Sequence, residues 1–166
     1  MSHALYEIES LRFYDESEIE LRDMIITRIS NTVKRTLLGV NSAWKFFRVE
    51  GPILTPRNFV SSSYDEDDIF MTQIEKASSR LVLRPETTAS SYAYARKMCA
   101  GNKLPLCIWQ SGKSFRVEKS DGATAAKLRF NEFYQLEFQC IYSVGTKADY
   151  RDYLIRGISK DIDVSS

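Results

Sequence analysis

The chain has 166 residues, 43% of them hydrophobic and 27% charged, and 23 basic against 22 acidic residues give a net charge of +1. This length is sufficient for one domain with a buried core. The balanced charge argues against a strong, sequence-blind nucleic-acid binder, which normally has a marked basic excess. Because the sequence has no signal-like start and no apolar run of bilayer length, we expect a soluble, cytoplasmic protein without a membrane partner.

The chain is predicted to start its regular structure with a helix over residues 17–38. Ser17 and Glu20 have the spacing of a capping box at its start, and Gly39 supplies a stop. Apolar residues recur at the three- and four-residue steps of one helix face. They are Leu21, Met24, Ile25, Ile29, Val33 and Leu37.

The next segments read as extended structure. A strand-like stretch over residues 44–54 is broken by Gly51 and Pro52. The polar segment 61–68 (SSSYDEDD) is expected to be a solvated surface loop, because it lacks the glycine and distal glutamate of a calcium loop. Residues 81–83 form a short apolar strand that leads into the sequence RPET.

The remaining elements are predicted to be a helix, two strands and a final helix. Thr87 or Thr88 can cap a helix that ends by Gly101. Strands follow over residues 106–118 and 128–142, and residues 147–160 are expected to be helical. The three cysteines (Cys99, Cys107 and Cys140) show no CxxC spacing and are expected to be reduced thiols, with no disulfide or metal site.

The two long strands carry the strongest pattern for function, because side chains alternate between the two faces of a strand. On the first, Arg116 and Glu118 share one face. On the second, one face is apolar (Tyr134, Leu136, Phe138 and Cys140) and the other polar (Arg129, Asn131, Phe133, Gln135, Glu137 and Gln139). An amphipathic sheet with one solvated face has the same alternation. Arginines suited to phosphate and an aromatic ring suited to a base nevertheless make an adenylate site a plausible use of this face.

Three sequence segments together resemble a known family: RPET at residues 84–87, GKSFRVE at 112–118 and NEFYQLE at 131–137. The arrangement is similar to the catalytic core of class II aminoacyl-tRNA synthetases, above all glycyl-tRNA synthetase. The resemblance implies a shortened α+β fold, an antiparallel sheet flanked by helices, as one domain over residues 1–166. Residues 17–56 would be motif 1-like, 81–98 the RPET segment and 106–142 motif 2-like.

The resemblance also assigns residues to ATP. Arg116 would hold the α-phosphate and act as the catalytic residue, and Glu118 would accept from the adenine amino group. Arg129 would clasp the γ-phosphate, and Phe133 would stack under adenine. Mg²⁺ would accompany ATP in a catalytic protein.

A second group of residues is assigned to the amino acid. Glu86 and Glu137 match acids of the amino-acid pocket, where Glu137 would meet the ammonium group. Gln135 would also line this pocket, and Arg84 would orient these groups. Acids around a small ammonium, with little room for a side chain, favour glycine as the substrate.

The sequence departs from the family in ways that keep three functions open. Asn131 stands where the family has an arginine, Thr88-Ala89-Ser90 replaces its alanine-glutamine-glycine, and no counterpart of motif 3 or of the anticodon-binding domain is visible. The chain could activate a small amino acid and transfer it to tRNA. It could instead be a non-catalytic paralogue that binds tRNA, nucleotide or protein, or a structural subunit like a polymerase accessory protein. The motif 1 resemblance predicts a homodimer through residues 17–38 and the strand around Pro52.

Overall fold

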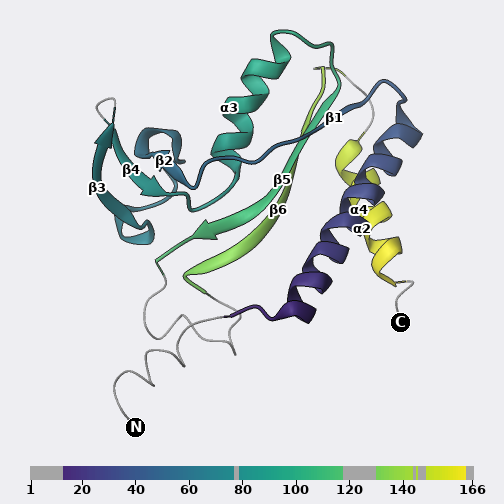
Figure 1. Ribbon diagram of the computed structural model, residues 1–166. Coiled ribbons are helices and arrows are strands. Elements are labelled where there is room, and N and C mark those ends of the chain that lie inside the picture. Colours follow the sequence, from purple (N-terminus) through teal and green to yellow (C-terminus); the bar gives the residue numbers. More distant parts are fainter. Residues whose placement is uncertain (1–12, 77–78, 118–129, 144, 146–148, 164–166) are drawn as a thin grey trace. The chain divides into compact units, whose positions relative to one another are not determined.

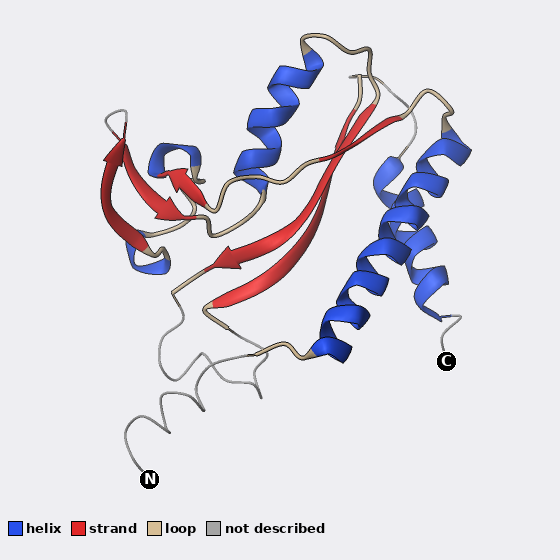
Figure 2. Ribbon diagram, in the orientation of Figure 1, coloured by secondary structure: helices blue, strands red, loops and turns tan. Residues whose placement is uncertain are grey.

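A computed structural model describes residues 13–76, 79–117, 130–143, 145 and 149–163 (Figures 1 and 2). The chain divides into two compact units, residues 1–39 with 149–166 and residues 40–148. Each unit is described by itself, and the expectation of one domain over residues 1–166 stays a prediction. Within the described ranges, no helix has both the length and the apolar character needed to cross a membrane.

In its described residues, the first unit is a pair of helices, α2 (Glu16–Val40) and α4 (Tyr150–Asp163). The capping box of α2 lies two residues earlier than expected. Asp15 accepts a hydrogen bond from the amide of Glu18 at 2.9 Å, and the Glu18 carboxylate accepts from the amide of Asp15 at 3.2 Å. The prediction from Ser17 and Glu20 is therefore wrong in register, since aspartate also satisfies the free amides of a first turn.

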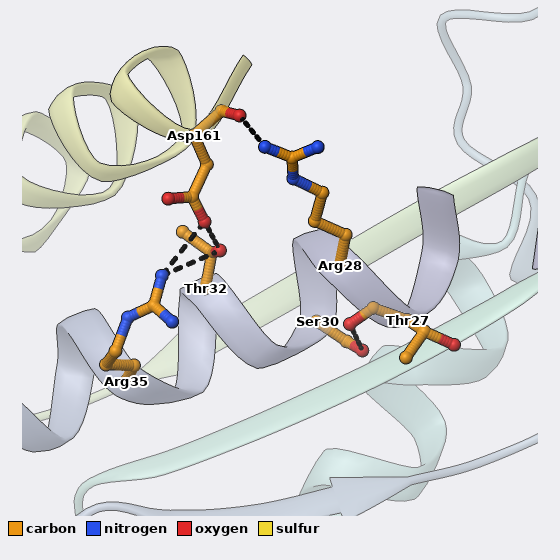
Figure 3. A network of polar contacts seen from close by, with 6 residues as sticks. All are labelled: Thr27, Arg28, Ser30, Thr32, Arg35 and Asp161. Carbon is orange, nitrogen blue, oxygen red and sulfur yellow. Dashed lines mark hydrogen bonds and ion pairs between the residues drawn. The ribbon is translucent and has the colours of Figure 1, made fainter. Parts of the chain in front are cut away.

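A polar cluster around Asp161 joins α4 to α2 (Figure 3). The Asp161 carboxylate accepts from the Thr32 hydroxyl and from the Arg35 guanidinium at 2.9 Å, and its main-chain carbonyl accepts from Arg28. One turn away, a Cβ added to Gly157 would lie 2.6 Å from the Thr36 hydroxyl. Close approach of the helices at Gly157 and polar bonding at Asp161 together fix how this pair packs.

The Asp161 cluster gives the helix pair a pH dependence that can be measured. Hydrogen bonding from Thr32, then the charges of Arg35 and Arg28, lower the pKa of Asp161 from its ordinary 3.8. A carboxyl with a lowered folded-state pKa stabilises the fold above its ordinary pKa and loses this effect as pH falls through the folded-state value. We therefore expect Asp161→Asn to lower the melting temperature at pH 7, and this difference to shrink below about pH 4.

Circular dichroism of both proteins across pH, with an NMR titration of the Asp161 carboxyl, measures this effect. Thr32→Val is the matched variant, because it keeps the size of a buried side chain and removes the donor. It should raise the Asp161 pKa toward its ordinary value. An Asp161→Asn effect of the same size at pH 3 and pH 7 would contradict the assignment.

The second unit contains two three-stranded sheets. In the first, β1 (Lys45–Arg48) lies parallel to β5 (Leu106–Phe115), and β5 pairs antiparallel with β6 (Glu132–Ile141). The β5–β6 register runs without a break from Leu106 opposite Ile141 to Phe115 opposite Glu132. The predicted antiparallel pairing of the two long strands is confirmed, with shorter ends than expected.

The second sheet is antiparallel, in the order β2 (Leu54–Pro56), β4 (Ser79–Leu83) and β3 (Met71–Lys76). Strand β3 was not expected from the sequence. The predicted break at Gly51 and Pro52 separates β1 from β2, which belong to different sheets. The architecture is the expected α+β class, although β1 makes the first sheet mixed instead of purely antiparallel.

Helix α3 (Thr88–Cys99) packs on the β5–β6 sheet through a close approach at Gly51. A Cβ at Gly51 would lie 2.1 Å from the Ser90 hydroxyl, so this turn requires a residue without a side chain. Thr87 is the N-cap residue, yet its side chain makes no capping bond to the helix. The predicted cap is wrong in this respect, because the Thr87 hydroxyl bonds Glu137 instead.

The segment over residues 61–68 is only partly the solvated loop expected. It contains the 3-10 helix η2 (Glu66–Asp68) and follows a second one, η1 (Arg57–Phe59). Tyr64 packs against a small core formed by Val60, Ile69 and Val82. The acidic residues of the segment are exposed, whereas Tyr64 is partly buried. Partial burial of the tyrosine ring removes apolar surface from water, which is favourable.

Candidate functional site

The polar face of β5 and β6 brings the predicted site residues together. Ser114 lies opposite Phe133, and the Arg116 amide donates to the Asn131 carbonyl at 3.0 Å, which continues the ladder by one pair. Residues opposite each other in an antiparallel pair present their side chains on the same face. Arg116 and Phe133 therefore share a face, as the alternation predicted.

The Arg116 guanidinium lies between two aromatic rings. Its central carbon is 5.1 Å from the centroid of Phe133 and 5.4 Å from that of Tyr64. Its Nε donates to the Pro85 carbonyl at 3.1 Å and its Nη2 to the Tyr64 hydroxyl at 3.0 Å. Phe133 thus has a flat partner on the charged face in this structure, and that partner is the guanidinium, held by cation–π attraction.

Tyr64 connects the arginine to the RPET segment. Its hydroxyl donates to Glu86 Oε2 at 3.2 Å while it accepts from Arg116. Burial, followed by the nearby Glu86 carboxylate, raises the pKa of Tyr64 above 10.0, while Arg116 acts in the opposite direction. Sequence reasoning missed this residue; the available signal was a lone aromatic within an acidic segment.

The amino-acid side of the predicted site is a hydrogen-bonded cluster. Glu137 Oε2 accepts from the Thr87 hydroxyl at 2.6 Å, and Glu137 Oε1 accepts from Gln139. Gln135 Oε1 accepts from the Thr87 amide at 3.3 Å and from the Ser114 hydroxyl. Thr87, at the start of α3, therefore bonds to both Gln135 and Glu137. It is a second residue to which the sequence reading assigned no role in the site.

Gln110 forms the floor below this cluster and is fully buried. Its side-chain amide donates at 2.7 Å to both the Thr87 carbonyl and the Ser91 hydroxyl, and its Oε1 accepts from the Gly51 amide at 3.1 Å. A buried amide with all its bonds made fixes its neighbours in one arrangement. Its signal in the sequence was a glutamine inside an apolar strand.

Arg84 is almost fully buried, with 3% of its surface exposed. Its Nε donates to the Lys113 carbonyl at 2.8 Å and its Nη1 to the Gly51 carbonyl at 2.7 Å. Burial lowers the pKa of Arg84, and Glu50 offsets part of that effect. A Cβ at Gly112 would lie 2.2 Å from Arg84 Nη2, so Gly112 makes room for the guanidinium. The bonds seen here orient the main chain around the site, and a part in amino-acid binding stays a prediction.

Two predicted nucleotide contacts, Glu118 and Arg129, lie outside the described residues. The predicted site residues that the structure describes are therefore Arg84, Glu86, Arg116, Phe133, Gln135 and Glu137. Across the described ranges, no group of three or more histidine, cysteine, aspartate or glutamate side chains is arranged to hold a metal ion.

Comparison with known sequences gives two kinds of relative, and no protein-family model matches the chain. The chain is 34% identical over 102 residues to the glycine–tRNA ligase of Mycoplasma genitalium, which covers 58% of the chain and 23% of the ligase. It is 25% identical over 130 residues to the histidine–tRNA ligase of Mycoplasmoides gallisepticum, covering 75% and 29%. The chain thus spans less than a third of these relatives.

Two solved structures share the fold. The ATP phosphoribosyltransferase regulatory subunit/histidyl-tRNA synthetase from Bacillus halodurans matches with a TM-score of 0.66 at 18% identity, over 92% of this chain and 37% of that one. A pyrrolysyl-tRNA synthetase from Desulfitobacterium hafniense matches with a TM-score of 0.58 at 16% identity, over 81% and 44%. These likenesses establish a shared architecture for the part of each protein that is covered.

Proposed function

We propose that this class II aminoacyl-tRNA synthetase-like core binds ATP or an aminoacyl-adenylate on the face formed by Arg116 and Phe133, and that it takes glycine or a similarly small amino acid. The observation that carries the proposal is the convergence of Arg116, Phe133, Gln135 and Glu137 on one face of β5 and β6. Glu86 reaches the same cluster through Tyr64. The sequence similarity to glycine–tRNA ligases supports the choice of amino acid.

In the proposed reaction, a carboxylate oxygen of the amino acid attacks the α-phosphorus of ATP. A new bond forms between this carboxylate oxygen and the α-phosphorus. The bond between the α-phosphorus and the oxygen that bridges the α- and β-phosphates breaks, and pyrophosphate leaves. Arg116 is the described cation best placed to stabilise negative charge on the α-phosphate, because a guanidinium donates two parallel bonds to phosphate oxygens. Its bonds to Pro85 and Tyr64 use Nε and one N–H of Nη2, so Nη1 and the second N–H of Nη2 are the donors we assign to phosphate oxygens.

Glu137 is the group we assign to the ammonium of the amino acid. Its two carboxylate oxygens accept from Thr87 and Gln139, which holds the carboxylate in a fixed position. Carboxylate oxygens have further acceptor sites beyond these two bonds. An ammonium group can therefore bind without breaking the Thr87 contact.

A non-catalytic paralogue is the second candidate. One solved structure that shares the fold is described as an ATP phosphoribosyltransferase regulatory subunit/histidyl-tRNA synthetase. In this candidate the same face binds a nucleotide, an adenylate or tRNA without chemistry.

The expected homodimer also stays a prediction. The apolar Leu21, Met24 and Ile25 of α2 are 51%, 57% and 44% exposed in the single chain.

Pyrophosphate exchange with each of the amino acids in turn, beside calorimetry with ATP, separates the candidates. We expect ATP to bind, and pyrophosphate exchange to be faster with glycine than with the other amino acids. The reason is that acidic side chains around the ammonium group, with little room for a side chain, favour a small amino acid. Binding without exchange would support the paralogue. If the protein shows neither ATP binding nor pyrophosphate exchange with any amino acid, the proposal that it binds a nucleotide is wrong.

A further inference from the structure

Two cysteines lie directly opposite each other on the face of the β5–β6 sheet that points away from Arg116. Cys107 on β5 pairs with Cys140 on β6, and both are present as free thiols. Arg116 shares a face with the even-numbered residues of β5, whereas Cys107 is odd-numbered and lies on the other face. The sequence reading expected separate core thiols, because the 33-residue step between these cysteines gives no spacing signal.

The main-chain bonding around Cys107 determines how close the pair is. The carbonyls of Pro105 and Trp109 accept from Lys45 and Val49, on the β1 side of β5. Alternate residues of a strand direct their main-chain groups to alternate sides, so Cys107 also directs its groups toward β1 and exchanges no main-chain bond with Cys140. Residues in such a non-hydrogen-bonded antiparallel pair have Cα atoms about 4.5 Å apart.

This spacing falls inside the range of Cα separations, about 4.4–6.8 Å, that a disulfide spans. The neighbouring pair on the same face confirms the close register, because the rings of Trp109 and Phe138 stack at 5.8 Å with 20° between their planes. We propose that Cys107 and Cys140 form a cross-strand disulfide when the protein meets an oxidising small-molecule disulfide or an equivalent oxidant. The bond would join β5 to β6 on the side opposite the candidate site.

Cys140 is the thiol that reacts first. Its side chain is partly accessible, whereas Cys107 has 0% of its surface exposed. A hydrogen bond from the Cys107 thiol lowers the pKa of Cys140 and outweighs the opposite effect of burial, and the same bond together with burial raises the pKa of Cys107. A thiolate at Cys140 is therefore both reachable and favoured, which are the two conditions for attack on a disulfide.

The chemistry is two successive exchanges. The Cys140 thiolate attacks one sulfur of the small disulfide, a mixed disulfide forms, and one small thiolate leaves. Cys107 loses its proton and attacks the sulfur of Cys140, which forms the cross-strand bond and releases the second small thiolate. The two protein thiols lose two electrons and two protons, and the oxidant is recovered as two small thiols.

The experiment uses the full chain with Cys99→Ser, because Cys99 is exposed and would form bonds between molecules. Dilute protein is incubated with oxidised glutathione, quenched with acid, denatured and alkylated with iodoacetamide. We expect the intact mass to fall by two hydrogens, neither cysteine to be alkylated, and a proteolytic peptide containing Cys107 to be linked to one containing Cys140. Dithiothreitol should restore both thiols.

Adding Cys107→Ala to the same background is the matched variant. It should stop at the first step, with glutathione retained on Cys140, because no second thiol is present to displace it. Full alkylation of both thiols after exposure in the Cys99→Ser protein would overturn the proposal, as would a stable glutathione adduct on Cys140 despite the presence of Cys107. The Cys99→Ser result decides the matter even if Cys107→Ala does not fold.

Discussion

Replacing Arg84 by alanine is expected to lower the free energy of unfolding by about 2–5 kcal/mol, since the change leaves two partly buried carbonyls without a charged donor and creates a cavity. The guanidinium bonds the carbonyls of Gly51 and Lys113, so it ties the turn after β1 to the end of β5. Arg84→Lys should recover part of the loss, because an ammonium can reach one carbonyl but not both in the fork geometry. Urea unfolding followed by circular dichroism measures both variants.

Gly112 supplies an internal control for Arg84. Alanine at position 112 would place its Cβ 2.2 Å from Arg84 Nη2, so Gly112→Ala alone should destabilise the protein by displacing the guanidinium. In the Arg84→Ala background the obstacle is gone, and the same change should cost much less. Two single effects that simply add in the double variant would show that the guanidinium does not occupy the space beside Gly112.

Replacing Arg116 by alanine is expected to weaken ATP or adenylate binding about ten- to a hundredfold, corresponding to charge-assisted bonds of roughly 1.5–3 kcal/mol. An arginine on the polar face of a strand is ordinarily expected to contribute little to folding. The structure changes that expectation, because Arg116 bonds Pro85 and Tyr64 and stacks on two rings. A fall in melting temperature is therefore expected as well, and calorimetry must be performed well below it.

Two variants separate the binding effect from the folding effect. Tyr64→Phe removes the hydroxyl that bonds Arg116 and Glu86 but keeps the guanidinium charge, so it should lower stability with a much smaller loss of ATP affinity. Arg151→Ala changes an exposed arginine of α4 outside the candidate site and should alter neither quantity. Unchanged ATP affinity in a folded Arg116→Ala protein would end the adenylate-site assignment.

Because the Arg116 guanidinium lies over the Phe133 ring, it affects how the base of a nucleotide can stack there. The guanidinium lies over the ring on which adenine is proposed to stack. A base must therefore share the ring with the guanidinium or move it toward a phosphate. Removing the Tyr64 hydroxyl weakens the bonds that hold the guanidinium in place, so the guanidinium moves more easily toward a phosphate. For this reason Tyr64→Phe should lower the stability of the protein and leave its ATP affinity nearly intact.

Local patterns in the sequence were sufficient for the three helices, for the two long strands and for the polar face. Alternation over residues 133–139 predicted which side chains share a face, because a strand has a period of two irrespective of its partners. The pairing of β5 with β6 followed from that pattern. The three- and four-residue steps of α2 likewise reflect a local helical period. The class II synthetase likeness rested on short motifs that stay recognisable in a single sequence.

The tertiary structure decided what local patterns cannot contain, namely contacts between residues distant in sequence. Tyr64 meets Arg116 across 52 positions, and Thr87 meets Glu137 across 50. The register of β5 and β6 likewise places Cys107 opposite Cys140. Helix and strand periods are set by neighbouring residues along the chain, whereas these contacts depend on how whole elements pack. The sequence by itself therefore determined which face bears the candidate site, and packing determined that a tyrosine, a threonine and a buried glutamine hold its charged groups in place.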